Sequence, residues 1–126
     1  MEHDHSHSDL IKEARSHLKA IFEESKQSIY LFLDDENKIC NKKFAALLGY
    51  KSPEEWSAVE DSFTQAFVDE KSQEKLVSAY QKAMNDFVGS SMEVEWKKKS
   101  GGKVKTKVIL VPFLFNGHLF ALHFID

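Results

Sequence analysis

The sequence predicts an α+β domain, in which an antiparallel sheet of about five strands carries central helices on one face, together with an N-terminal amphipathic helix. Two observations lead to this class. Apolar residues recur with helical spacing near the N-terminus and in the middle of the chain, whereas alternating residues and turn signals fill the chain from residue 91 onward. The 126 residues suffice for one domain with a core of its own.

The N-terminal part divides into a polar, histidine-rich tail over residues 1 to 8 and an amphipathic helix over residues 9 to 27. Ser6 and Asp9 resemble a capping box with a shorter acid, so the helix is expected to begin near residue 7. The apolar positions that share one side of this helix are Leu10, Ile11, Ala14, Leu18, Ile21 and Phe22.

Two short strands and two helix starts follow. The apolar run SIYLFL leads into the turn residues DDEN and a second strand, KIC. Asn41 is placed to cap a helix that ends at Gly49 in the left-handed conformation. Ser52, Pro53 and Glu55 then mark the start of another helix: Ser as the cap, Pro at the first position and Glu reaching back.

The second half predicts a long helix and three strands. Residues 57 to 69 look irregular or briefly helical, and Asp69 is placed to cap the long helix. The pair Asn116-Gly117 is the strongest hairpin signal in the chain. The apolar positions assigned to one face of the long helix are Leu76, Val77, Tyr80, Ala83, Met84 and Phe87.

The last two strands are apolar on both faces. Ile109 and Val111 alternate with Val108 and Leu110, so neither side of this strand is suited to water. A sheet of this kind needs cover on both sides. We expect the central helices to cover one face, and the N-terminal helix or a partner subunit to cover the other.

Several motifs together resemble a PAS domain over residues 28 to 126. They are the acidic turn DDEN, Asn41 ahead of FAALLGY, the string Pro53-Glu54-Glu55-Trp56 and the hairpin at Asn116-Gly117. The resemblance implies a freestanding sensory and protein-interaction domain without enzymatic activity. It further implies that a small ligand occupies the core and that the signal leaves through the N-terminal helix or a homodimer interface, or passes to a partner signalling protein.

Aromatic side chains at the junction of helices and sheet suggest where a ligand would bind, because concave ligand sites are commonly lined by aromatic residues. The same residues could instead simply fill the core. The candidates for lining a core pocket are Tyr30, Phe32, Cys40, Phe44, Leu48, Phe63, Phe67 and Trp96.

The cofactors known for PAS domains are disfavoured. A PAS photoreceptor that forms a flavin adduct carries its cysteine in an Asn-Cys-Arg-Phe-type motif, whereas Cys40 here precedes Asn41. A small buried strand cysteine is therefore expected. Haem would need a histidine on the long helix, and residues 70 to 87 contain none. His118 and His123 have opposite parity, so they cannot face one cavity together, and a hydrogen-bonded structural histidine is expected.

The tail histidines His3, His5 and His7 are candidate metal ligands. A free terminal amine, two backbone nitrogens and the imidazole of His3 would form a square-planar site suited to Ni(II) or Cu(II). The alternative is a solvated tail without a metal.

Composition limits the partners. A net charge of −3 gives no reason to expect nucleic-acid binding. The lysines at one end of the hairpin around Gly101-Gly102 are expected to face solvent and to guard the sheet edge: Lys97, Lys98, Lys99, Lys103, Lys105 and Lys107. The longest apolar run, VILVPFLF, is too short to span a membrane, so a cytoplasmic protein is expected.

Two other functions stay open at this point. A small cone-shaped α+β isomerase or dehydratase also combines helices with a curved sheet, and His118 or His123 with Tyr30 would be its visible catalytic candidates. The third interpretation is a metal-binding accessory protein that uses the histidine tail.

Overall fold

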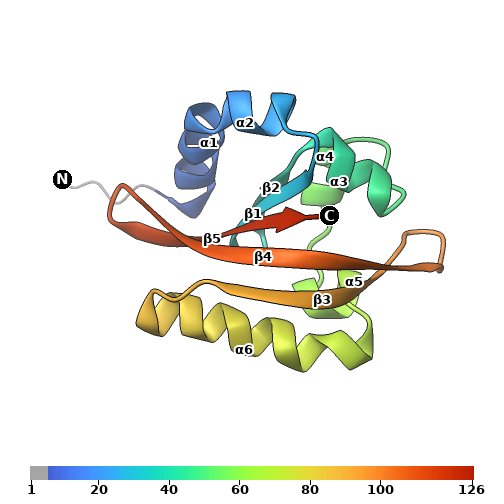
Figure 1. Cartoon of the computed structure of the whole chain (residues 1–126). Helices are drawn as coiled ribbons and strands as arrows, with labels where there is room; N and C mark the ends of the chain where they lie inside the picture. The colour runs from blue at the N-terminus through green and yellow to red at the C-terminus, as the bar shows by residue number, and fades with distance from the viewer. Residues whose placement is uncertain (1–5) are drawn as a thin grey trace.

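The computed structural model describes residues 6 to 126 as a five-stranded antiparallel sheet with helices on both sides, which confirms the α+β prediction (Figure 1). The helices are α1 (His7–His17), α2 (Lys19–Glu24), α3 (Lys42–Leu47), α4 (Pro53–Ser57), α5 (Phe63–Phe67) and α6 (Glu70–Asp86). The strands are β1 (Ser28–Asp34), β2 (Asn37–Cys40), β3 (Ser90–Lys97), β4 (Lys103–Phe115) and β5 (His118–Ile125).

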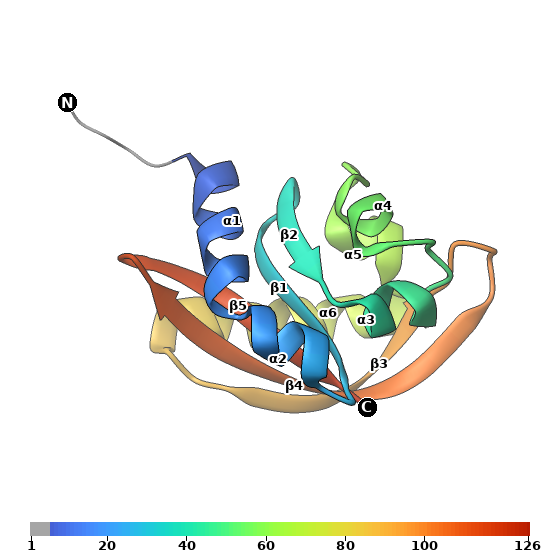
Figure 2. The same cartoon turned by 90° about the horizontal axis from the view of Figure 1, so that it is seen from above.

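The strand order is β2-β1-β5-β4-β3, so the first strand pairs with the last one in the middle of the sheet. The helices α3 to α6 connect β2 at one edge to β3 at the other. Figure 1 shows α1 and α2 on one side of the sheet and α6 on the other, and Figure 2 shows α3, α4 and α5 grouped beside β2. The β4–β5 turn has positive φ at both Asn116 and Gly117, as its sequence predicts.

The helix starts lie where the capping residues predict them. The side-chain oxygen of Asn41 accepts from Phe44 N–H at 3.0 Å, and that of Ser52 accepts from Glu55 N–H at 3.1 Å. Asp69 caps α6 in the same way. One detail differs from a capping box: the Glu55 carboxylate accepts from Lys51 N–H at 2.7 Å, one residue before the cap.

Two hydrophobic clusters lie on opposite faces of the sheet. The inner core packs the sheet against α3 to α6 around Phe44, Trp56 and Trp96. The outer core packs α1 and α2 against Ile29 and Phe120 and their neighbours. The expectation that the N-terminal helix covers the second face is therefore confirmed for these strand positions.

The predicted N-terminal helix is in fact two helices. Leu18 leaves helical geometry at φ −98°, and its N–H is shared between the carbonyls of Ala14 and Arg15. Such sharing is common at helix ends. The second helix ends at Glu24 rather than near residue 27, because Ser25 is extended. The helix begins at His7, as the capping signal at Ser6 predicts, so His7 and Ser8 belong to α1 rather than to the tail.

The long helix buries a narrower face than predicted. Val77 is exposed, and Phe87 is 58% exposed. Phe87 takes the left-handed conformation at φ 58°, which ends α6 and turns its ring away from the core. Of the predicted positions, Leu76 and Ala83 are buried, and Tyr80 and Met84 are partly buried. Ser72 and Ala79 complete the buried face.

Candidate functional site: a pocket beside helix α6

A pocket of about 210 Å³ opens where β1, α5 and α6 meet. Its walls are apolar side chains from all three elements, among them Phe32, Phe63 and Leu76. Exposed polar residues, including Asp35 and Ser62, stand at its mouth. The arrangement is that of a small binding site, with an apolar interior and a few polar groups at defined positions.

The walls follow from helix and strand periodicity. Tyr30 and Phe32 are two residues apart on β1 and so point to the same face, and Leu76 and Tyr80 are four apart on α6. Phe32 meets Phe63 edge to face at 5.2 Å between centroids, and meets Tyr80 in the same way at 5.5 Å. Edge-to-face contacts are a favoured aromatic geometry, so these walls are well packed.

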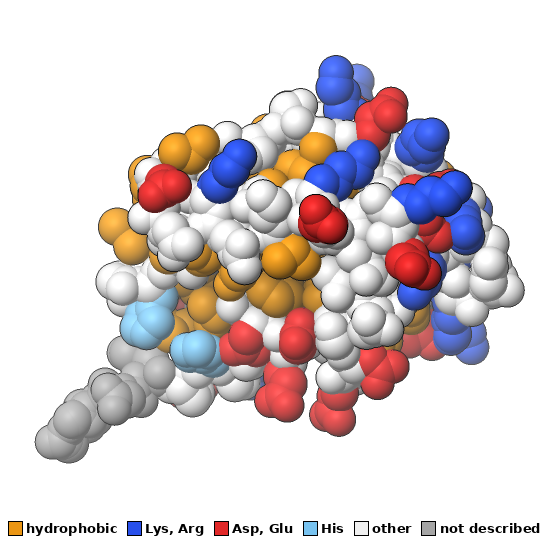
Figure 3. All heavy atoms as spheres, turned by 90° about the horizontal axis from the view of Figure 1, so that it is seen from below, with side chains coloured by type: hydrophobic (Ala, Val, Ile, Leu, Met, Phe, Trp, Pro, Cys, Tyr) orange, Lys and Arg blue, Asp and Glu red, His pale blue; other side chains and the backbone are white. Residues whose placement is uncertain are grey.

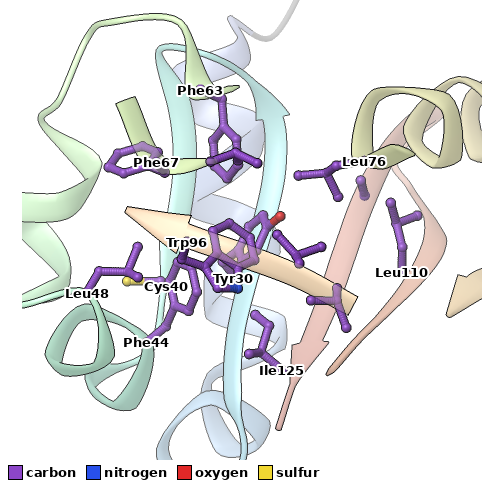
Figure 4. Packing of buried hydrophobic residues seen from close by; sticks show 14 of the residues in the cluster. Tyr30, Cys40, Phe44, Leu48, Phe63, Phe67, Leu76, Trp96, Leu110 and Ile125 are labelled. Atoms are coloured by element: carbon purple, nitrogen blue, oxygen red, sulfur yellow. The ribbon is translucent and has the colours of Figure 1, made fainter. Parts of the chain in front are cut away.

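Tyr30 and His123 are the most deeply buried lining residues. They are paired positions of β1 and β5, and their rings stack with centroids 3.9 Å apart. Within residues 6 to 126, neither Tyr30 Oη nor His123 Nδ1 has a hydrogen-bond partner. Figure 4 shows the Tyr30 hydroxyl directed toward the side of Phe63 and Leu76. A buried polar group without a partner costs about 1–3 kcal/mol, so a pair of them calls for an explanation.

Burial keeps both groups neutral. It lowers the pKa of His123 to about 3, against a weaker opposing effect of the backbone at Ala121 and Tyr30. Burial likewise raises the pKa of Tyr30 well above its usual value. The pocket therefore presents a neutral imidazole and a protonated phenol at neutral pH.

Two side chains of the β1–β2 hairpin hold the mouth in place. Asp35 Oδ1 accepts from Phe63 N–H at 3.0 Å, which fixes the start of α5. Lys38 is only 2% exposed, and its Nζ donates to the carbonyls of Asp35 at 2.7 Å and Val59 at 2.6 Å. Burial lowers the pKa of Lys38, while Asp35 and Asp34 oppose that shift. The loop between α4 and α5 is thus fastened to the hairpin.

The predicted pocket residues separate into two groups. Tyr30, Phe32 and Phe63 line the pocket. The other five belong to the close-packed inner core or its surroundings: Cys40, Phe44, Leu48, Phe67 and Trp96. Aromatic rings fill this part of the core: the ring centroids of Phe44 and Trp96 are 5.3 Å apart. The Trp96 indole N–H donates a hydrogen bond to Thr106 Oγ1 at 2.8 Å.

Sequence reasoning did not name several lining residues. Leu76 and Tyr80 were assigned only to the buried face of a helix, although their spacing of four signals a shared face. The sequence alone does not decide whether His118 or His123 points inward. The structure places His123 inside and His118 at the surface, and the expected hydrogen bond is missing at His123 Nδ1 within residues 6 to 126.

Cys40 is a buried free thiol at the end of β2. Burial raises its pKa to about 12, so the thiolate form is disfavoured. A nucleophilic or metal-binding role requires the thiolate. Its placement fits the expected structural strand cysteine.

The tail metal site falls mostly outside the described part of the chain, because His3 and His5 precede residue 6. His7 lies in the first turn of α1, and its Nδ1 pairs with the Asp34 carboxylate. From residue 6 onward, no three His, Cys, Asp or Glu side chains come together as metal ligands. Over the same residues, no helix combines the length and apolar character needed to cross a membrane.

The lysine-rich end of the molecule is the β3–β4 hairpin. Three of its lysines make specific contacts: Lys103 with Asp69 at 2.7 Å, Lys99 with Glu55 at 2.8 Å, and Lys97 with the carbonyl of Gln65 at 2.9 Å. Figure 3, which views the molecule from below, shows Lys and Arg side chains gathered at one end and Asp and Glu side chains along another edge. The lysines therefore help to join the hairpin to α4, α5 and α6.

Solved structures that resemble this chain include several PAS domains. The PAS domain of an HTR-like protein from Haloarcula marismortui is 22% identical, with a TM-score of 0.63 over 92% of this chain and 93% of that one. A PAS domain from Colwellia psychrerythraea is 20% identical, with a TM-score of 0.67 over 90% and 94%. The PAS-B domain of Drosophila melanogaster Cycle, solved with bound ethylene glycol, is 10% identical, with a TM-score of 0.64 over 79% and 97%.

The match rests on architecture, because the sequence itself matches no family model and no curated protein. The neighbours cover most of this chain, and this chain covers nearly the whole of each neighbour. The TM-scores of 0.63 to 0.67 show that the neighbours share the overall fold of this chain. The chain therefore has the fold of a PAS domain.

Proposed function

We propose that this chain is a sensory and interaction domain that binds a small molecule in the pocket beside α6 and reports its presence through α1. One observation carries the proposal. Tyr30 lies in the pocket, while its neighbours Ile29 and Leu31 pack against α1 on the other face of the sheet. Because protein interiors are close-packed, a ligand that shifts Tyr30 also shifts the residues beneath α1.

The β1–β2 turn gives a second connection between pocket and helix. Asp35 binds the backbone of Phe63, which lines the pocket. The adjacent Asp34 binds His7 in the first turn of α1. A ligand that moves Phe63 would therefore strain a turn that also holds the start of α1.

The output surface that we propose is the outer patch, defined here as Ile109, Val111 and Phe124. Ile109 is 45% exposed and Val111 is 37% exposed. Both lie on the sheet face that α1 covers at β1 and β5. The occupant is a second copy of this chain, so that a movement of α1 changes the edge of a homodimer interface. The ethylene glycol in the PAS-B domain of Cycle supports the idea that this fold accommodates small molecules.

Amide NMR spectra recorded during a fragment screen test the sensory role. The library should contain neutral, cationic and anionic fragments. We expect at least one fragment to shift the amides of Leu76 and Tyr80 together with those of Leu10 and Ala14. The β3–β4 turn at Gly101 serves as the internal control and should not respond. Binding that leaves α1 unchanged contradicts transmission, and the failure of every fragment contradicts the binding role.

Sedimentation of surface variants tests the homodimer. We expect the wild-type protein to dimerise, and Val111→Asp to produce a monomer, because the patch would acquire a buried charge. Leu114→Asp is the matched control, because Leu114 is 61% exposed on the same strand and lies outside the patch. A monomeric wild type, or equal loss of dimer in both variants, would show that the patch is not the interface.

A further inference from the structure

We infer that the pocket selects an uncharged ligand of about eight heavy atoms, with a single ring or similar apolar body and one hydroxyl that hydrogen-bonds Tyr30 Oη and His123 Nδ1. This inference rests on the proposed function, since it names the class of molecule that the pocket would sense.

The size follows from the volume. An apolar cavity of about 150 Å³ accommodates benzene, which has six heavy atoms. By the same proportion, the pocket of about 210 Å³ holds about eight. Flavins, haem and nucleotides are several times larger than this, so none of them fits the pocket in its present shape.

The hydroxyl follows from the two buried polar atoms. Tyr30 Oη is both a donor and an acceptor, and His123 Nδ1 is one or the other according to the imidazole tautomer. A hydroxyl group also donates and accepts, so it can pair with both atoms in either tautomer. A carboxylate only accepts and an ammonium only donates, so neither has this freedom.

The absence of charge follows from the surroundings. No lysine or arginine within residues 6 to 126 lines the pocket, and the nearby Lys38 ammonium is turned toward backbone carbonyls. A bound carboxylate would therefore lose its hydration without gaining a cation. The acidic lining residue Asp35 is exposed at the mouth, so an ammonium held between Tyr30 and His123 would also lack a buried counter-charge.

Titration with four probes of similar size tests this selectivity: benzyl alcohol, toluene, benzoate and benzylammonium. We expect benzyl alcohol to bind at least tenfold more tightly than either ion, and several-fold more tightly than toluene. Tyr30→Phe should weaken benzyl alcohol binding by about tenfold, which is the value of one neutral hydrogen bond, and leave toluene binding unchanged. Tyr50→Phe is the matched control, because it removes a half-exposed hydroxyl that lies outside the pocket and should preserve the selectivity.

The outcomes separate the ligand class from the binding role itself. If benzoate or benzylammonium binds as tightly as benzyl alcohol, the proposed class is wrong while the pocket keeps its role. If all four probes fail but another library fragment shifts Leu76 and Tyr80, the class is again wrong. If Tyr30→Phe weakens toluene and benzyl alcohol equally, the hydroxyl does not contact Tyr30. Titration of His123→Gln with benzyl alcohol checks the contact between the ligand hydroxyl and His123 independently of Tyr30. The thermal unfolding curve of this variant shows whether it is folded.

Discussion

The phenol ring of Tyr30 lies face to face with the imidazole ring of His123, with 3.9 Å between centroids and 11° between ring planes. The two residues come from β1 and β5, the first and last strands along the chain, which pair in the middle of the sheet. Tyr30 Oη and His123 Nδ1 have no hydrogen-bond partners among residues 6 to 126, and both residues line the pocket. A core optimised only for stability would not keep two such groups.

Replacing Tyr30 by phenylalanine should stabilise the empty protein. The change removes a buried hydroxyl that has no partner within residues 6 to 126 and keeps the stacked ring. We expect the free energy of unfolding in urea to rise by about 1 kcal/mol. Tyr80→Phe should change it by less than about 0.5 kcal/mol, as most half-exposed positions do. A clear loss of stability in Tyr30→Phe would mean that an ordered water satisfies the hydroxyl.

His123 should make the protein less stable in mild acid. Its pKa is near 6.5 when unfolded and falls to about 3 in the fold because of burial. Between these values the unfolded chain takes up a proton that the folded chain does not, so stability falls as the pH drops below 6.5. From pH 7 to pH 5 this group should remove about 2 kcal/mol from the free energy of unfolding.

The slope of stability against pH, measured by urea unfolding at both pH values, checks this assignment. His123→Phe should lose less stability over the interval than the wild type, whatever its absolute stability. His118→Gln is the matched control, because it replaces an exposed histidine of the same strand. Equal slopes in wild type and His123→Phe would show that the buried imidazole does not cause the acid sensitivity.

Much of the fold could be predicted because its signals are local. Asn41 and Ser52 cap helices through hydrogen bonds that span three residues, and Asn116-Gly117 forms the expected turn. The two-sided apolar pattern of β5 correctly indicated cover on both faces of the sheet, whereas Ile109 and Val111 of β4 remain 45% and 37% exposed. These features depend on spacing along the chain, which a sequence displays directly.

The position of the pocket could not be predicted, because it depends on what fails to fill the core. Phe44 and Trp96 meet and close one part of the inner core, while Phe32 and Tyr80 border an open part. Both groups look alike in sequence, as aromatic residues at buried positions. The partnership of Tyr30 with His123 depends on the pairing of the first strand with the last, which no local pattern encodes.

Lys38 should stabilise the protein by holding the loop between α4 and α5 in place at the pocket mouth. Lys38→Met keeps a side chain of similar length but removes the ammonium, which lies 5.5 Å from the centroid of the Trp56 ring. The carbonyls of Asp35 and Val59 then lose their donor. We expect a loss of about 2 kcal/mol in the free energy of unfolding, with faster amide exchange in residues 58 to 62. Lys42→Met, at an exposed helix position, should be nearly neutral. A stabilised Lys38→Met would show that burying the charge costs more than its hydrogen bonds return.

Asn41 should matter more than an ordinary helix cap, because its amide joins three parts of the chain. Its Oδ1 accepts from Phe44 N–H at 3.0 Å and from Ile29 N–H at 3.1 Å, and its Nδ2 donates to the carbonyl of Gln27 at 2.9 Å. Asn41→Ala should therefore cost about 3 kcal/mol, whereas Ser52→Ala, which removes a single capping bond, should cost about 1 kcal/mol. Asn41→Asp separates the contributions, since it keeps the acceptor, loses the donor and buries a charge. Urea unfolding of the three variants measures these differences, and equal losses in Asn41→Ala and Ser52→Ala would show that the bonds to Ile29 and Gln27 add nothing to the cap.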